Sequence, residues 1–411
     1  MKPRQFRLGA KLGNALARLR ALPASRWMSP VVPPEFARWI ASNEPAPDRW
    51  AGMSGQELPY RPLISIILPV YRIPHHVLTS TLRSITRQTY PRWQACIAYA
   101  DVENQENWEL IRGHADGDSR FHVRRMEGNR GISSNSNEAL RLATGEFIAL
   151  LDHDDEIAPW ALYIFAKKIA ENPDADFLYS DKDCITEDGS KRLNPLFKPQ
   201  WSPEMLYSVN YLTHLNVMRR SVVEDVGGFR PETDGAQDWD LFFRVTERSR
   251  RILRVEGILY HWRMLATSTS TGAAAKPYAA RAQLRTVGDR LRRLGLPAEA
   301  EPSAESGFRI RWHPSPWQAD IIVHSNGGDR SRIDRLLSGL AQDRVRSVIV
   351  AADPGARPED FPHGRMRLGP RLKVLPEGLP GSAGGGSSLA QLLTADVVAF
   401  VSAEVARFSD E

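Results

Sequence analysis

Three aspartates crowd into four residues of the chain, in the segment Asp152-His153-Asp154-Asp155. Carboxylates this close repel one another, and a cation or a shared proton usually offsets that repulsion. Hard oxygen ligands suit Mg²⁺ or Mn²⁺, and proteins often hold Mg²⁺ by one or two carboxylates together with substrate phosphates. Such an ion would neutralise the charge that develops on a departing diphosphate. The alternative for so short a motif is a solvated acidic turn in which Asp155 caps the following helix.

The segments around these aspartates predict an α/β fold. Residues 63–68 and 147–151 are short apolar runs typical of buried strands. Strand and helix patterns alternate between them, which indicates a mainly parallel sheet with helices on both faces. Ligands of such sheets bind beyond the carboxyl ends of the strands. Asp101 and the 152–155 cluster both follow predicted strands directly, so we expect them at the ligand-binding edge.

Changes in composition divide the chain into three parts. Residues 1–62 combine a basic N-terminal segment with an irregular lead-in rich in Pro and Trp. Residues 63–300 hold the alternating strands and helices of the main domain. Residues 301–411 predict a smaller C-terminal α/β region that contains a Gly/Ser-rich stretch.

A weak internal repeat links the C-terminal region to the main domain. Residues 394–401 align without gaps with residues 144–151, and Ser402-Ala403-Glu404 then takes the place of Asp152-His153-Asp154. The C-terminal region is therefore either a partial, degenerate copy of the main domain or a chance match between two strands of similar composition.

Overall composition is that of a soluble globular protein, with 42% hydrophobic and 25% charged residues. The two cysteines, Cys96 and Cys184, are far apart and lack the spacing of metal ligands, which argues against a disulfide framework and a thiolate zinc site and fits a reducing compartment. No apolar run approaches the ~20 residues that span a bilayer. We therefore expect a cytoplasmic protein.

Basic charge is concentrated at the N-terminus. The first 26 residues carry seven Lys or Arg and no acidic residue, with leucines near helical spacing. This segment is either an amphipathic helix on the anionic inner face of the cell membrane or a solvated terminus. Elsewhere the basic residues are dispersed and not interleaved with aromatics, which argues against a nucleic-acid partner.

Several longer motifs follow one another along the chain. Ser65-Ile-Ile-Leu-Pro-Val-Tyr71 and Gly128-Asn-Arg-Gly-Ile-Ser133 precede the aspartate cluster, and Val226-Gly-Gly-Phe229 and Gln237-Asp-Trp-Asp-Leu241 follow it. In this order they resemble the inverting family 2 glycosyltransferases with the GT-A fold, a Rossmann-like architecture. The resemblance covers roughly residues 36–300.

Two further segments refine this resemblance. Leu196-Phe-Lys-Pro199 and Tyr260-His-Trp-Arg263 are similar to segments of bacterial polysaccharide and O-antigen transferases, which are often rhamnosyltransferases.

The resemblance implies the central catalytic roles. Asp152 and Asp154 match the D-x-D pair that binds the metal and the diphosphate of a nucleoside diphosphate sugar. Asp238 matches the base that takes the proton of the acceptor hydroxyl as its oxygen attacks the anomeric carbon. The rival interpretation of Asp238 is a helix cap.

Residues on the donor side follow from the same resemblance. Pro69, Tyr71 and Asp101 lie where the family packs the nucleotide base, and Arg130 belongs to a motif on the approach to the metal site, so we assign it to donor binding. His261 stands where a late metal or phosphate ligand would fall. A packed, hydrogen-bonded histidine is an equal alternative for His261.

On the acceptor side we expect Gln237 and Trp239, with the indole forming an apolar floor under a sugar ring or simply belonging to the core. Two positions depart from the family pattern. Tyr99 and Ala100 replace the usual paired aspartates, so that Asp101 comes one residue later, and Gln237 replaces the more common Glu. The first departure puts the donor base in doubt.

The resemblance thus implies transfer of a sugar from a nucleoside diphosphate donor to a cell-surface polysaccharide or lipid-linked glycan, by metal-assisted, inverting, in-line displacement. A degenerate scaffold in a polysaccharide complex is the alternative. The altered turn at Asp101 favours a scaffold, whereas the retained Asp152, Asp154 and Asp238 oppose it. A sugar-nucleotide pyrophosphorylase is disfavoured, because the chain lacks an N-terminal Gly-rich phosphate loop with Lys or Arg.

Overall fold

A computed structural model describes most of the chain and divides it into two units. The described residues are 33–46, 49–50, 52–55, 58–265, 277–303, 307–313, 319–324, 330–338, 345–352, 356–368, 370, 372–376 and 397–402. The larger unit ends at Arg311, and the smaller one takes in Trp312–Glu411. The predicted basic segment of residues 1–26 lies outside the described residues. None of the described helices is long and apolar enough to cross a membrane.

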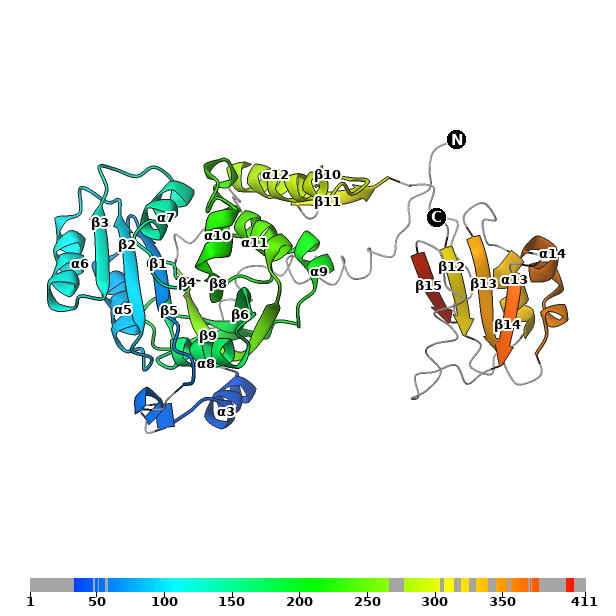
Figure 1. Cartoon of the computed structure of the whole chain (residues 1–411), viewed down its shortest axis with the longest axis horizontal. Helices are drawn as coiled ribbons and strands as arrows, with labels where there is room; N and C mark the ends of the chain where they lie inside the picture. The colour runs from blue at the N-terminus through cyan, green and yellow to red at the C-terminus, as the bar shows by residue number, and fades with distance from the viewer. Residues whose placement is uncertain are drawn as a thin grey trace. The chain divides into compact units, whose positions relative to one another are not determined.

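A nine-stranded sheet forms the centre of the larger unit, in the order β3-β2-β1-β4-β8-β6-β9-β5, with β7 paired to β6 (Figure 1). Strands β3, β2, β1 and β4 are mutually parallel, as are β6 and β9, whereas β8 runs antiparallel between β4 and β6. The strands are β1 Ile64–Val70, β2 Trp93–Tyr99, β3 Phe121–Arg125, β4 Phe147–Leu150, β5 Glu156–Ile157, β6 Phe177–Ile185, β7 Arg192–Leu196, β8 Asn216–Arg219 and β9 Ile252–Arg263.

Helices cover both faces of this sheet because its buried strands carry apolar residues on both faces. In β1, Leu68 belongs to an apolar cluster with α5 and α8, whereas its neighbour Ile67 belongs to a second cluster with α7 and α11. The helices are α3 Pro34–Asn43, α5 His75–Thr86, α6 Gln105–Gly117, α7 Ile132–Leu140, α8 Ala161–Glu171, α9 Pro203–Ser208, α10 Arg220–Asp225, α11 Gln237–Arg248 and α12 Pro277–Arg293, with short 3₁₀ turns η1 Gly52–Gly55 and η2 Pro231–Thr233. The predicted α/β fold with a mainly parallel sheet is confirmed.

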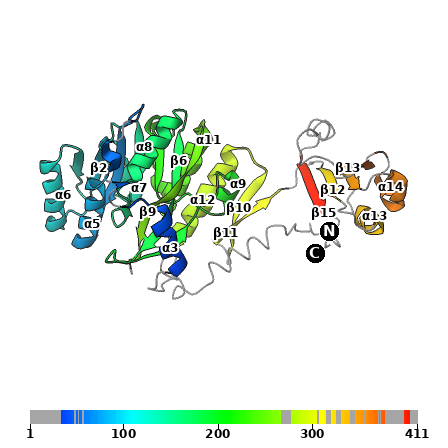
Figure 2. The same ribbon diagram turned by 90° about the horizontal axis from the view of Figure 1, so that it is seen from below.

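A hairpin completes the larger unit. Strands β10 (Ala298–Ser303) and β11 (Gly307–Trp312) pair with each other. Figure 1 and Figure 2 both show this hairpin beside α12, the helix that precedes it.

The smaller unit contains a four-stranded parallel sheet in the order β14-β13-β12-β15. This order repeats that of β3-β2-β1-β4 strand for strand, with parallel pairing throughout. The elements are β12 Ala319–His324, α13 Arg330–Ser338, β13 Val345–Ala352, η3 Pro358–Asp360, α14 Pro362–Leu368, β14 Leu372–Pro376 and β15 Val397–Ser402.

A buried polar pair recurs at the same place in both sheets. Ser65 and Gln94 are register partners on β1 and β2, and the Ser65 hydroxyl donates to Gln94 Oε1 at 3.0 Å. Asp320 and Ser347 are register partners on β12 and β13, and the Ser347 hydroxyl donates to Asp320 Oδ1 at 2.5 Å. Both pairs join the second residue of the central strand to its neighbour, so the likeness of the two sheets extends to a side-chain contact.

Candidate active site

The aspartate cluster forms a turn between β4 and β5, and its last member holds that turn in place. Asp155 is 0% exposed. The Tyr260 hydroxyl donates to Asp155 Oδ2 at 2.5 Å, and the backbone N–H of Arg263 donates to Asp155 Oδ1 at 2.7 Å. Both partners belong to β9. Asp155 therefore fastens the turn to the neighbouring part of the sheet, which is a positioning role and not the helix cap that the sequence left open.

Two side chains fix the backbone of Asp154 and of His153, the residue that separates it from Asp152. Arg263 Nε donates to the carbonyl of Asp154 at 2.9 Å, and the Thr81 hydroxyl donates to the carbonyl of His153 at 2.9 Å. The Asp152 side chain is 48% exposed. The turn is thus rigid in its backbone and open at the carboxylate that the D-x-D motif assigns to a metal.

His214, on the loop before β8, faces this carboxylate. Its Nε2 lies 3.7 Å from Asp152 Oδ2, and its ring stacks on Tyr260 with centroids 4.7 Å apart. Asp152, Asp155 and His214 present possible ligand atoms that all lie within 4.8 Å of one another. Within the described part of the chain, this cluster is a candidate cation site made of two carboxylates and an imidazole.

A buried lysine holds the His214 loop. Lys198 Nζ donates to the carbonyl oxygens of Leu212 at 3.1 Å, Thr213 at 2.5 Å and His214 at 2.6 Å. His214 has a φ of 43°, which is uncommon for a residue with a side chain and needs support from its surroundings. Burial lowers the pKa of Lys198 well below its ordinary value. This lysine therefore positions the imidazole without touching the cation site.

Asp238 lies in the first turn of α11 and reaches the same site. Its Oδ1 accepts from the Trp239 N–H at 2.8 Å, and its Oδ2 accepts from Asn210 Nδ2 at 2.9 Å. Burial raises the pKa of Asp238, although these hydrogen bonds oppose the rise. A carboxylate of raised pKa, held in one orientation, is suited to accepting a proton.

The charges of the site act on one another. Although the Asp152 side chain is half exposed, the protein around its carboxylate removes part of its hydration, and this desolvation, followed by the charges of Asp154 and Asp238, raises the pKa of Asp152 to about 7. Burial lowers the pKa of Lys182 on β6, and among the nearby charges that oppose this are Asp155, Asp152 and Asp238. The structure therefore brings the D-x-D motif, the expected base and a lysine into one electrostatic unit.

On the donor side, the structure gathers some of the expected residues. Pro69 ends β1 in a buried position, and Tyr71 follows it half-buried. The backbone of both hydrogen-bonds to His153, which opposes the lowering of that histidine's pKa by burial. Asp101 is buried just beyond β2, next to β1 in the sheet. Arg130 is exposed on the loop before α7 and pairs with Glu138 at 3.4 Å.

Three other expected site residues have contacts of their own within the protein. Trp239 is 4% exposed, and its Nε1 donates to the carbonyl of Leu206 at 2.9 Å, so its ring belongs to the core and offers no face to a sugar. Gln237 is half-buried and accepts from the Gly235 N–H at 2.9 Å. His261 binds Asp183 through Nδ1 at 2.6 Å and is not brought to Asp152.

Sequence reasoning missed His214, Lys182 and Lys198. Lys198 stands in the Leu196-Phe-Lys-Pro199 segment, whose likeness to polysaccharide transferases was a usable signal. Neither His214 nor Lys182 belongs to a motif quoted above, and no periodic pattern points to either.

Part of the main domain matches a known protein family. Residues 65–227 match the family described as Glycosyl transferase family 2. The chain is 38% identical over 256 residues to an uncharacterized protein of Sinorhizobium fredii, y4gI, covering 61% of this chain and 28% of the relative. It is 31% identical over 381 residues to the O-antigen biosynthesis protein RfbC of Myxococcus xanthus, covering 90% of this chain and 29% of the relative. The chain thus spans less than a third of the length of either relative.

Solved structures show weaker likeness. The S. aureus TarS fragment 1-349 in complex with UDP-GlcNAc is 20% identical, with a TM-score of 0.46, covering 56% of this chain and 66% of that one. The mannosyltransferase PcManGT from Pyrobaculum calidifontis, in complex with GDP-Man and Mn²⁺, is 16% identical, with a TM-score of 0.44. The match covers 69% of this chain and 74% of that one. Likeness at this level says nothing about substrate.

Proposed function

Residues 65–227 belong to glycosyl transferase family 2, and from that premise we propose that the chain transfers a sugar from a nucleoside diphosphate donor to a glycan with inversion at the anomeric carbon. The observation that carries the proposal is the convergence of Asp152, Asp154 and Asp238 on one site from two distant parts of the chain. A cation ligand set and a proton acceptor are the two functions that a single in-line displacement needs.

A divalent cation fits the carboxylate side of this site. Asp152 and Asp154, as the D-x-D pair, would hold it, and the imidazole of His214 supplies a further ligand atom near Asp152. Carboxylates suit Mn²⁺ and Mg²⁺, and an imidazole nitrogen is better tolerated by the softer Mn²⁺. When bound, the ion would neutralise the negative charge of the departing nucleoside diphosphate.

Asp238 would act on the acceptor. Its two hydrogen bonds fix both oxygens, so the carboxylate does not need to reorient when an acceptor hydroxyl arrives. It takes the hydroxyl proton while the oxygen attacks the anomeric carbon and the bond to the diphosphate breaks. Lys182, the cation that faces the carboxylates, would limit their mutual repulsion before the donor and metal bind.

The donor base would rest against Pro69, Tyr71 and Asp101 at the ends of β1 and β2, with Arg130 near the phosphates. The Myxococcus relative is named as an O-antigen biosynthesis protein, which supports a cell-surface polysaccharide or lipid-linked glycan as acceptor. A cytoplasmic enzyme held at the membrane by the basic N-terminal segment would suit such an acceptor.

We also infer that the smaller unit is a second copy of the first four strands of the transferase domain. The shared strand order, the parallel pairing and the recurring buried pair Asp320–Ser347 support this inference beyond the short sequence match. Ser402 and Glu404 stand where the main domain has Asp152 and Asp154, and a hydroxyl with one carboxylate is a poorer metal site than two carboxylates. We therefore assign the metal-dependent step to the larger unit.

The test is release of nucleoside diphosphate from a panel of UDP-, dTDP- and GDP-sugars, with and without Mn²⁺ or Mg²⁺. We expect one donor class to be turned over, dependence on the metal, and loss of turnover in Asp154→Ala. Release from no donor would instead support a scaffold without catalytic activity. Release that Asp154→Ala leaves unchanged would overturn the assignment of the metal-dependent step to this site.

A further inference from the structure

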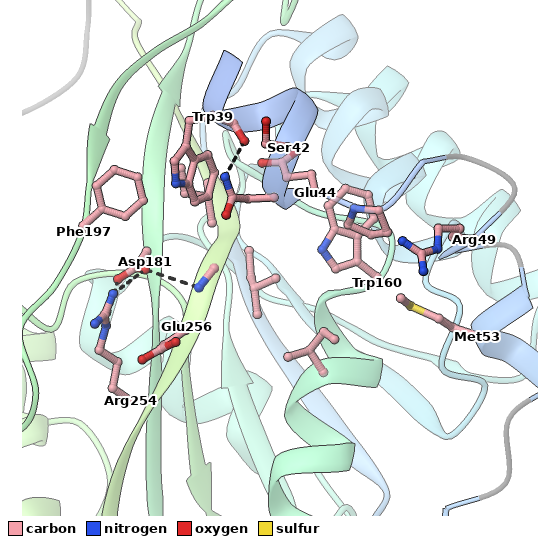
Figure 3. A pocket seen from close by; sticks show the side chains of 16 residues that line it. Trp39, Ser42, Glu44, Arg49, Met53, Trp160, Asp181, Phe197, Arg254 and Glu256 are labelled. Carbon is pink, nitrogen blue, oxygen red and sulfur yellow. Dashed lines mark hydrogen bonds and ion pairs between the residues drawn. The ribbon is translucent and has the colours of Figure 1, made fainter. Parts of the chain in front are cut away.

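A second hollow lies in the larger unit, on the face of β6 that is turned away from the aspartate cluster. Its volume is about 730 Å³, within the usual range of small-molecule sites (Figure 3). Asp181 lines it, whereas the next residue, Lys182, faces the aspartates. Successive side chains of a strand point to opposite faces of the sheet. The hollow is therefore separate from the candidate active site.

A bulge in β9 shapes the floor of this hollow. Ser180 pairs with Val255, but the next residue, Asp181, pairs with Ile258, so two residues of β9 stand out of register. One of them is Gly257, with a φ of 120°, a conformation that suits glycine. Bulges of this kind often lie beside functional sites and re-aim the side chains around them.

A buried carboxylate holds the bulge open. Asp181 is 1% exposed. It accepts from Arg254 Nη2 at 2.8 Å, from the Gly257 N–H at 3.3 Å and from the Lys198 N–H at 2.8 Å. The floor is therefore rigid before any ligand arrives, and the charge of its carboxylate is matched by a guanidinium.

The opposite wall is α3 and the residues after it, fixed to the sheet by a charged clamp. Arg192 binds both oxygens of Glu44 at 2.6 Å and Asp183 Oδ2 at 2.6 Å. A bidentate arginine–carboxylate pair is among the stronger and more directional polar contacts in proteins. Charge on this wall is therefore also balanced within the protein.

Aromatic rings line the hollow at both ends. Trp39 and Phe197 meet edge to face with centroids 4.9 Å apart, and Phe197 remains 46% exposed. Trp160 lies at the other end, beside Arg49 and Met53 (Figure 3). An exposed ring over a preformed hollow is a common sign of a binding surface.

We propose that this hollow is a subsite for a glycan chain, remote from the reacting end. Ring faces at Trp39, Phe197 and Trp160 can pack on the apolar faces of sugar rings, while exposed polar groups such as Glu256 and Ser42 can exchange hydrogen bonds with hydroxyls. The proposal rests on the proposed function insofar as it takes the ligand to be the acceptor glycan.

The charges disfavour the other ligands of such an enzyme. The diphosphate of a nucleotide would need several free cations. Arg254 is committed to Asp181 and the nearby Arg192 to Glu44, which leaves Arg49 as the one remaining cation among the described residues that line the hollow. An isoprenoid tail would bury these ion pairs against hydrocarbon with no partner for the exposed Glu256, which is costly. A neutral glycan meets neither penalty.

The test measures binding of the whole 411-residue chain, without donor or metal, to a printed array of bacterial glycans. We expect binding to a defined set of glycans and about a tenfold loss, or about 1.4 kcal/mol, in Phe197→Ala and in Trp39→Ala, because aromatic side chains at the centre of an interface are among those that cost most when truncated. Leu196→Ala is the matched control, because Leu196 is the exposed neighbour of Phe197 and does not line the hollow. It should bind as the unmodified protein does.

Binding to no glycan, or equal binding by Phe197→Ala and Leu196→Ala in proteins of equal melting temperature, would overturn the proposal. Selective binding of isoprenoid phosphate vesicles through the same residues would overturn it as well. Release of nucleoside diphosphate to water should be the same in Phe197→Ala and Leu196→Ala. Glycan binding without any turnover would count against the proposed function and leave the subsite standing.

Discussion

Replacing Asp238 with asparagine should remove the proposed base while keeping nearly all of its contacts. The asparagine oxygen can still accept from the Trp239 N–H, which now lies 2.8 Å from Asp238 Oδ1. The new amide group would face the Asn210 amide, which now donates to Asp238 Oδ2. Asn210 Oδ1 is buried without a hydrogen-bond partner among the described residues. A flip of the Asn210 amide would therefore turn this oxygen toward the new amide and keep a hydrogen bond between the two side chains.

The expected loss is in turnover and not in folding. A positioned general base contributes about 10²- to 10⁴-fold to the rate, or about 3–5 kcal/mol of transition-state stabilisation. Because one hydrogen bond is kept and the other can be replaced, the free energy of unfolding should change by no more than about 1 kcal/mol. Burial raises the pKa of Asp238, so turnover of the unmodified protein should rise as pH increases past that raised value. The variant should lack this rise.

The assay is release of nucleoside diphosphate at saturating donor and metal, alongside donor binding by calorimetry and a thermal melt. Asp225→Asn on α10 is the control, because it removes one exposed negative charge outside the site. A variant that keeps most of its turnover would refute Asp238 as the base. A large fall in melting temperature with a modest loss of turnover would support a helix cap.

Three further outcomes follow from the same contacts. Burial and neighbouring charges raise the pKa of Asp152 to about 7, so this carboxyl loses its proton only as pH rises through 7. Mn²⁺ should therefore bind about tenfold more weakly at pH 6 than at pH 8 in calorimetric titrations. An affinity for Mn²⁺ that does not change with pH would contradict this. Lys198→Met leaves three loop carbonyls without their hydrogen-bond donor. The free energy of unfolding, measured by heat or denaturant, should fall by about 1–3 kcal/mol, and Mn²⁺ binding should weaken. No change in either measurement would argue against a positioning role for Lys198. A Cβ at Gly145 would come within 2.5 Å of Ser65 Oγ, so Gly145→Ala should lower the free energy of unfolding by about 1–3 kcal/mol. A Cβ at Gly128 would meet nothing within 4 Å, so Gly128→Ala should unfold like the unmodified protein. Equal stability of the two glycine variants would contradict the close packing at Gly145.

Much of the candidate site was predictable from the sequence because its acidic residues directly follow strands. A short apolar run followed by acidic residues locates both a buried strand and the ligand-binding edge of its sheet. That reasoning placed Asp152 and Asp154 beyond β4 and Asp101 beyond β2, and the strand ends lie where it put them. The same reasoning cannot rank the members of a cluster, so it did not separate Asp155, which is fully buried and fastened to β9, from the more exposed Asp152.

At the start of α11, the sequence motif could not tell which of two neighbouring residues faces the site. Asp238 and Trp239 are adjacent in the first turn, and the motif assigned both to the site. Adjacent residues on a helix differ in direction by about 100°, so a helix packed on the core turns one neighbour in and the other out. Stacking on Phe243 and a hydrogen bond from the indole N–H to the Leu206 carbonyl hold Trp239 in the core, which leaves the Asp238 carboxylate at the site.

The two histidines show why a ligand position cannot be carried over from sequence order alone. On β9, Tyr260 turns its hydroxyl to Asp155, so His261, one residue on, must point to the opposite face. There it pairs with Asp183, its register partner on β6 and part of the clamp that holds α3. An imidazole next to Asp152 must therefore come from another element, and His214 provides it from the loop before β8. Tyr260 stacks on that imidazole and holds it beside Asp152, so His214→Gln should weaken Mn²⁺ binding. His261→Gln should leave Mn²⁺ binding unchanged and loosen α3 instead, because His261 pairs with the Asp183 carboxylate that binds Arg192.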